Sequence, residues 1–113
     1  MFKPKTFNDG VAYIYREKER VTDFKAKKNV TSLADMDFIV KLDYEEMSKR
    51  EQDQEFANEN GFSLSLKIRT RKVSGVDNKC KAVIENYLYD ISYVDKGKGE
   101  LYLFLEGVRE LAD

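Results

Sequence analysis

One segment near the middle of the chain alternates apolar and polar side chains, and this pattern restricts its conformation more than any other feature of the sequence. In residues 62–71, the apolar side chains occupy every second position, namely Phe62, Leu64, Leu66 and Ile68. Successive side chains of a β-strand point to opposite faces, whereas an α-helix repeats every 3.6 residues. The pattern therefore predicts a strand with one face in a core.

Similar patterns, separated by short polar breaks or turn signals, predict more strands. They occupy residues 11–15, 37–44, 81–84, 87–94 and 100–106. We therefore expect a mainly β protein, a small antiparallel β-barrel or sandwich of about five to six strands with one short helix. The side chains expected in its core are Phe38, Val40, Leu42, Leu64, Leu66, Ile68, Ile91, Leu103 and Leu105.

The helix is expected at residues 48–60, which end in an asparagine before a glycine. Ser48 followed by Glu51 three residues later is the spacing of a capping box. Only Phe56 and Ala57 are apolar candidates for contact with the core. The helix is therefore expected to project from the domain, to pack marginally, or to become ordered only against a partner.

The length of 113 residues and the 42% hydrophobic content fit a single domain over residues 1–113. The 20 basic and 21 acidic side chains nearly cancel, so no global field favours DNA or an anionic membrane. The apolar runs are far shorter than the roughly 20 residues of a membrane span, and we expect a soluble, unsecreted chain.

Cys80 is the single cysteine and is expected to be a small packed residue. Residues 21–35 are expected to form an exposed loop.

The absence of histidine from the sequence excludes serine–histidine and cysteine–histidine catalysis and histidine-ligated zinc within this chain. The acids Glu45 and Glu46, or Asp53 with Glu55, lie in hydrated positions that would not separate their pKa values. The Gly-Lys-Gly segment at residues 97–99 is typical of a hairpin turn rather than of a phosphate loop. We therefore expect no catalytic residue, no cofactor site and no metal site, and not an enzyme.

Charge is separated along the chain even though it cancels overall. Residues 45–59 carry six acids and two bases, whereas residues 62–81 carry six bases and one acid. Ordinary surface ion pairs would explain this, and so would attraction between neighbouring copies of the chain. A third alternative is a small nucleic-acid-binding β-barrel that uses Lys67, Arg69, Arg71 and exposed tyrosines. Most of the aromatic rings, however, are expected to alternate into the core.

The order of these signals extends over nearly the whole chain. It comprises the turn Asn8-Asp9-Gly10, the strand Phe38-Ile39-Val40-Lys41-Leu42 before the acidic pair Glu45-Glu46, the helical residues 55–61, the strand 62–71, the hairpin ending in Tyr89-Asp90-Ile91, and residues 101–106. This order resembles the head-tail connector proteins of long-tailed bacteriophages, which are called head closure, head-tail adaptor or stopper proteins.

The resemblance implies a phage or prophage structural protein that catalyses nothing. It would assemble as a ring between portal and tail and complete the channel through which the genome leaves. Its partners would be portal or adaptor proteins and tail proteins, and DNA would pass without sequence-specific binding and without any membrane. It would be found in the host bacterial cytoplasm during assembly and then in the virion neck. We expect the free protein to be monomeric or weakly associated until the portal templates the ring.

The interaction surface is expected in residues 45–60 and 21–35, the stretches too polar for the core. Ordering the backbone costs about 1–2 kcal/mol per residue, so a polar excursion should gain order from neighbours. Glu51, Asp53 and Glu55 are expected to face a lumen or an adjoining subunit, with the complementary charge on Arg69 and Arg71. The full set of expected interface residues is Glu45, Glu46, Lys49, Arg50, Glu51, Asp53, Glu55, Phe56, Arg69 and Arg71.

Overall fold

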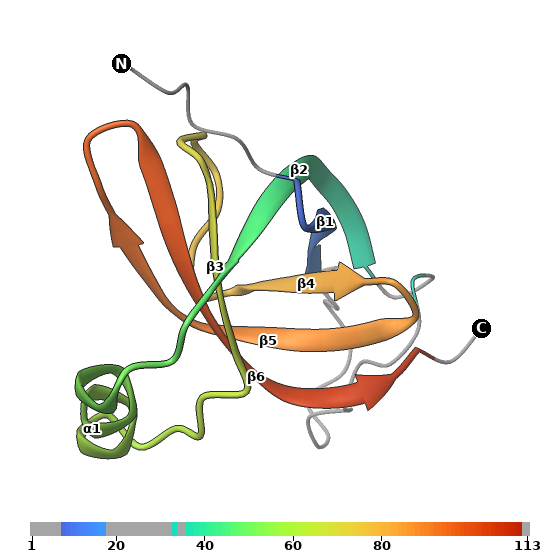
Figure 1. Cartoon of the computed structure of the whole chain (residues 1–113). Coiled ribbons are helices and arrows are strands. Elements are labelled where there is room, and N and C mark those ends of the chain that lie inside the picture. The colour runs from blue at the N-terminus through green and yellow to red at the C-terminus, as the bar shows by residue number, and fades with distance from the viewer. Residues whose placement is uncertain (1–7, 18–32, 34–35, 112–113) are drawn as a thin grey trace.

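The computed structural model of the chain describes residues 8–17, 33 and 36–111, and within them it has six strands and one helix (Figure 1). The elements in chain order are β1 (Gly10–Glu17), β2 (Met36–Met47), α1 (Glu51–Glu59), β3 (Leu66–Arg71), β4 (Cys80–Ile84), β5 (Tyr87–Lys96) and β6 (Glu100–Glu110). Apart from Leu33, the predicted exposed loop at 21–35 lies outside the described residues.

The six strands form a closed barrel in the order β1-β2-β3-β6-β5-β4, and every neighbouring pair is antiparallel. The predicted mainly β fold with one short helix is confirmed, and the sheet closes into a barrel rather than forming a sandwich. The strand predicted at 62–71 begins only at Leu66, because the preceding residues return from α1 to the barrel. Its partner β2 extends to Met47, which pairs with Lys67 of β3.

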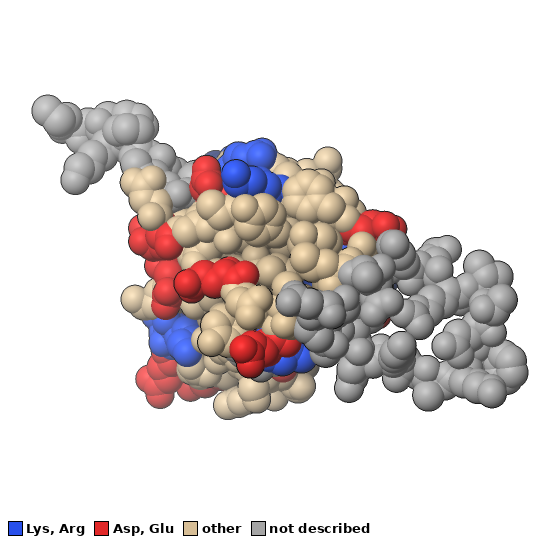
Figure 2. Space-filling view, turned by 90° about the vertical axis from the view of Figure 1, so that its right-hand side faces the viewer, with Lys and Arg blue, Asp and Glu red and all other residues tan. Residues whose placement is uncertain are grey.

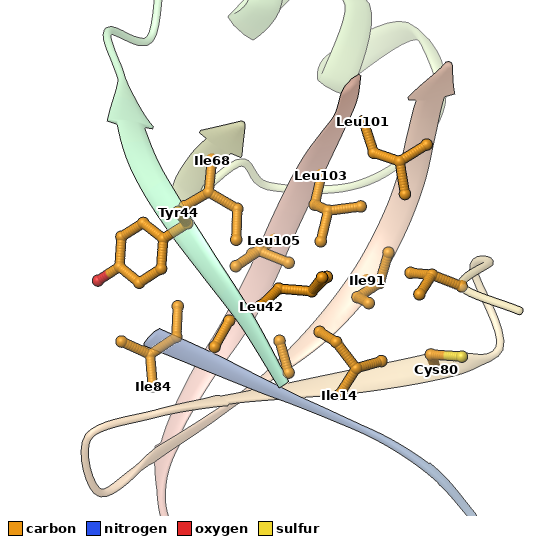
Figure 3. Close-up of a cluster of buried hydrophobic side chains, with 13 residues drawn as sticks. Ile14, Leu42, Tyr44, Ile68, Cys80, Ile84, Ile91, Leu101, Leu103 and Leu105 are labelled. Atoms are coloured by element: carbon orange, nitrogen blue, oxygen red, sulfur yellow. The ribbon is translucent and has the colours of Figure 1, made fainter. Parts of the chain in front are cut away.

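The barrel interior is filled by apolar side chains from all six strands (Figure 3). Five of the predicted core residues are at most 2% exposed, namely Leu42, Ile68, Ile91, Leu103 and Leu105. Val40 and Leu66 are partly buried against this cluster, and Leu64 is buried in a separate cluster beside α1. Alternation along the strands therefore predicted most of the core correctly, because a closed barrel has one inner face.

Phe38 was expected in the core, but this prediction is wrong because the residue is 55% exposed. The pairing of β1 with β2 shifts register so that Ile14 lies opposite Val40 while Tyr15 lies opposite Phe38. This β-bulge inserts Ile39 as an extra residue, which turns Phe38 to the outer face, where its ring contacts Tyr15 at a centroid distance of 5.6 Å. Strict alternation fails wherever a bulge changes the face.

Two tyrosines of β5, Tyr87 and Tyr93, also depart from the expectation that aromatic rings alternate into the core, whereas Tyr89 packs against it. The pairing of β5 with β6 shifts register between Leu88 and Asp90 and again between Ile91 and Tyr93. Tyr93 is consequently 40% exposed, whereas Ile91 is buried in the barrel. Several aromatic rings thus lie on the outside of the barrel, and one group of them holds the helix.

Candidate interaction surface

The connection between β2 and β3 leaves the barrel and carries α1, which lies beside one end of the barrel (Figure 1). α1 is shorter than the predicted helix at 48–60. The predicted capping box of Ser48 and Glu51 is wrong, because Arg50 is the N-cap and has extended backbone angles. Asp53, three residues later, accepts a hydrogen bond from the Arg50 backbone N–H at 3.0 Å. Because β2 continues to Met47, the chain turns into the helix three residues later than expected.

Asp53 and Lys67 form a buried ion pair that connects α1 to the barrel. Each residue is 6% exposed, and Lys67 Nζ donates to Asp53 Oδ1 at 3.1 Å. Lys67 alternates with core residues of β3 and therefore lies on the outer face, in register with Phe104 of β6. Its ammonium lies 5.2 Å from the centre of the Phe104 ring and 5.6 Å from that of Tyr102. The Asp53 carboxylate and the faces of the Phe104 and Tyr102 rings thus take the place of the water that would otherwise solvate the Lys67 ammonium.

The surroundings of Asp53 favour its charged form. Burial by itself would raise the pKa of this carboxyl. The hydrogen bonds from the Arg50 backbone and from Lys67, together with the positive charges of both side chains, outweigh burial and hold the pKa of Asp53 below its ordinary value. The carboxylate therefore acts both as the cap of α1 and as the partner of Lys67.

Aromatic packing supplies the second contact between α1 and the barrel. The ring of Phe56 lies 4.7 Å from Tyr93, 5.7 Å from Phe104 and 6.2 Å from Phe62, measured between centroids. Ala57 is buried in the same place. The expectation that the excursion lacks support from its own domain is therefore wrong, because the apolar partners come from β5, β6 and the return to β3 rather than from the helix.

A pocket of about 410 Å³ opens beside this junction. Its lining residues come from the end of β2, from the connection between β2 and α1, from β3 and from the β5–β6 pair. They are Met47, Ser48, Arg50, Lys67, Asp95 and Tyr102. The pocket holds both basic and acidic groups. It is a polar recess at the helix junction.

The remaining predicted interface residues fall into separate places. Arg69 is engaged within the chain, because it pairs with Glu45 of β2 and lies 4.0 Å from Glu100 of β6. Lys49 donates to the backbone oxygen of Ser65 at 2.9 Å. The Glu46 backbone N–H donates to Asp9 at 2.7 Å, and the Glu46 side chain is exposed. Arg71 is exposed at the far end of β3.

Of the three acids expected to face a neighbour, Glu51 and Glu55 are exposed on α1, but Asp53 is buried in its own subunit. The structure therefore joins Asp53 to Arg50 and Lys67, and Glu45 to Arg69, but brings neither Arg69 nor Arg71 to the helix. Sequence reasoning missed Tyr93 and Phe104, and it named Lys67 only for nucleic-acid binding, not as the partner of Asp53. Their role depends on pairing between distant strands, which no local signal reports.

The thiol of Cys80 is 1% exposed, and burial raises its pKa. It therefore packs as an apolar side chain and is a poor nucleophile at neutral pH. Among the described residues no cluster of acids or cysteine has the arrangement of a metal site. No helix in that part of the chain is long and apolar enough to cross a membrane.

No protein-family model matches this chain, and no curated protein matches it with significant similarity.

The first prediction concerns the ion pair. Lys67→Met should lower the free energy of unfolding by about 3 kcal/mol, because it leaves the Asp53 carboxylate buried without its main counter-charge. The double variant Asp53→Asn with Lys67→Met should recover part of this loss, since the amide still accepts the Arg50 N–H and carries no charge. Urea unfolding measures both. A change below about 0.5 kcal/mol in Lys67→Met, the usual size of a surface effect, would contradict the assignment.

A second prediction concerns pH. A carboxyl whose pKa is lower in the folded than in the unfolded state stabilises the folded protein at pH values above the unfolded pKa, which is about 3.9 for aspartate. This stabilisation is lost as the pH falls through the pKa of the folded state. The stability difference between wild type and Asp53→Asn should therefore be constant near neutral pH and shrink below about pH 4. The other acids with lowered pKa values, Asp77 and Asp90, are present in both proteins and cancel. Urea unfolding across this pH range tests it, and a difference independent of pH would refute it.

Proposed function

We propose that this protein is a structural head-tail joining protein of a long-tailed bacteriophage or prophage, a head closure or adaptor protein. In this proposal several copies form a ring between portal and tail and complete the channel for DNA exit. The observation that carries the proposal is a closed antiparallel barrel with a helix-bearing excursion between β2 and β3, fixed to the barrel by the Asp53–Lys67 pair. The resemblance of the sequence implies a barrel with one short helix, and this architecture agrees with it.

The closed barrel also favours assembly through side-chain contacts rather than through the addition of a strand to the sheet. An open sheet can add the strand of a neighbour at its edge, but a closed barrel has no such edge. The barrel interior is packed with apolar side chains (Figure 3), so ligands and partners must bind outside it. The excursion and the hairpin turns are therefore the parts with which such a subunit would contact other proteins.

The nucleic-acid-binding barrel remains the alternative, and two of its three proposed basic residues are engaged within the chain. Lys67 is buried against Asp53, and Arg69 pairs with Glu45. On the face shown in Figure 2, acidic and basic side chains are interspersed rather than gathered into one basic groove. Exposed rings such as Tyr13 and Phe38 are present, but single-strand binding combines rings with a continuous positive path.

The third prediction tests the proposed function with phage particles. The protein should co-sediment with DNA-filled, portal-bearing capsids that lack neck proteins, prepared from the phage or prophage that encodes it. Capsids without portal serve as the matched control and should not bind. The alternative is tested in parallel by titrating labelled single-stranded DNA at several salt concentrations. Salt-dependent DNA binding together with no binding to portal-bearing capsids would overturn the proposal.

A further inference from the structure

The exposed side of α1 carries three carboxylates in one row, which we call the acidic stripe: Glu51, Glu55 and Glu59. They are four residues apart and therefore neighbours on the helix surface, where like charges destabilise a helix. Glu59 also lies in the last turn, which contains no basic residue, although the helix dipole favours cations there. Among the described residues none of the three has an ion-pair partner. The stripe is thus an unpartnered charged helix face.

A second charged surface lies where β3 ends beside the turn between β5 and β6. We call it the basic end, and it consists of the exposed side chains Arg71, Lys72, Lys96 and Lys98. The Lys72 backbone N–H donates to Gly99 at 3.1 Å, and Lys72 Nζ donates to Gly97 at 3.3 Å, so the two segments are joined. Within the part of the chain that the structure describes, none of these four side chains has a carboxylate partner.

The two surfaces cannot neutralise each other within one subunit. α1 is attached at Lys67, and Arg71 lies four residues further along the same strand, which is about 13 Å at roughly 3.3 Å per residue. Figure 1 shows the β5–β6 turn above α1 on the same side of the barrel, so the two surfaces are separate. This separation exceeds the screening length of about 8 Å at physiological ionic strength, so each surface is available to another molecule.

We propose that the acidic stripe of one copy docks on the basic end of a second copy. Contact between two different patches is a head-to-tail contact, and repetition of such a contact produces a ring or an open filament. This inference rests on the proposed function, because only the portal would select the closed ring. It changes the expected contact of Glu51, Asp53 and Glu55 with Arg69 and Arg71. Asp53 and Arg69 drop out of that contact because both side chains are occupied inside the subunit.

The fourth prediction uses charge exchange. One variant carries Glu51→Lys, Glu55→Lys and Glu59→Lys, a second carries Arg71→Glu, Lys96→Glu and Lys98→Glu, and a third combines all six changes. Self-association at low salt should weaken about tenfold in each of the first two variants. A single exposed ion pair contributes little, but reversing the charge of one surface turns several attractive pairs between the two copies into repulsive ones. The combined variant should associate again, because both surfaces exchange sign. Sedimentation equilibrium measures the association.

A charge-matched control separates this contact from net charge. Asp43→Lys, Glu85→Lys and Glu110→Lys change three exposed acids outside the stripe, and this variant should associate like wild type. Carbodiimide joins carboxylates to amines in direct contact, so mixed isotope-labelled and unlabelled protein should give intermolecular links between the stripe and Lys96 or Lys98. Failure of the combined variant to recover, or equal weakening in the control, would overturn the inference.

The outcome is independent of the capsid experiment. Binding to portal-bearing capsids without any stripe-to-basic-end links on those particles would leave the proposed function standing and refute this contact. Links of this kind without capsid binding would support the contact and count against the head-tail role.

Discussion

The ion pair between Asp53 and Lys67 determines how α1 is held on the barrel. Asp53 begins the helix by accepting the Arg50 N–H, and the same carboxylate accepts from the Lys67 ammonium on β3. Removing either charge would leave the other buried, and an unpaired buried charge is far more costly than an exposed one. The pair therefore couples helix formation to barrel formation, because Lys67 reaches its position only when β3 pairs with β2 and β6.

The aromatic contacts depend on this geometry and add to it. Phe56 reaches Tyr93 and Phe104 only when the helix begins at Glu51 and lies against the outer face of β5 and β6. The excursion therefore keeps its exposed acids at a fixed place relative to the barrel. A fixed surface loses less conformational entropy on binding than a mobile one.

The sequence predicted those features that depend on local periodicity and not those that depend on distant pairing. Alternation identified Leu42, Ile68 and Leu103 as core residues, because strand neighbours determine which face a side chain occupies. Phe38 was misplaced by a bulge between β1 and β2, which the pairing of the strands creates. Lys67 looked like a solvent-facing residue of an alternating strand, and only the return of α1 to that face makes it buried.

Together, the ion pair and the aromatic contacts imply that α1 is already folded and attached in the free subunit. Amide hydrogen exchange of residues 54–59 in the isolated protein tests this most directly, because protection of exposed helix amides reports the free energy of local opening. We expect strong protection of these amides in wild type. In Lys67→Met this protection should be lost, while the amides of β5 and β6 remain protected. Exchange of these helix amides at the rate of an unstructured peptide in wild type would contradict it.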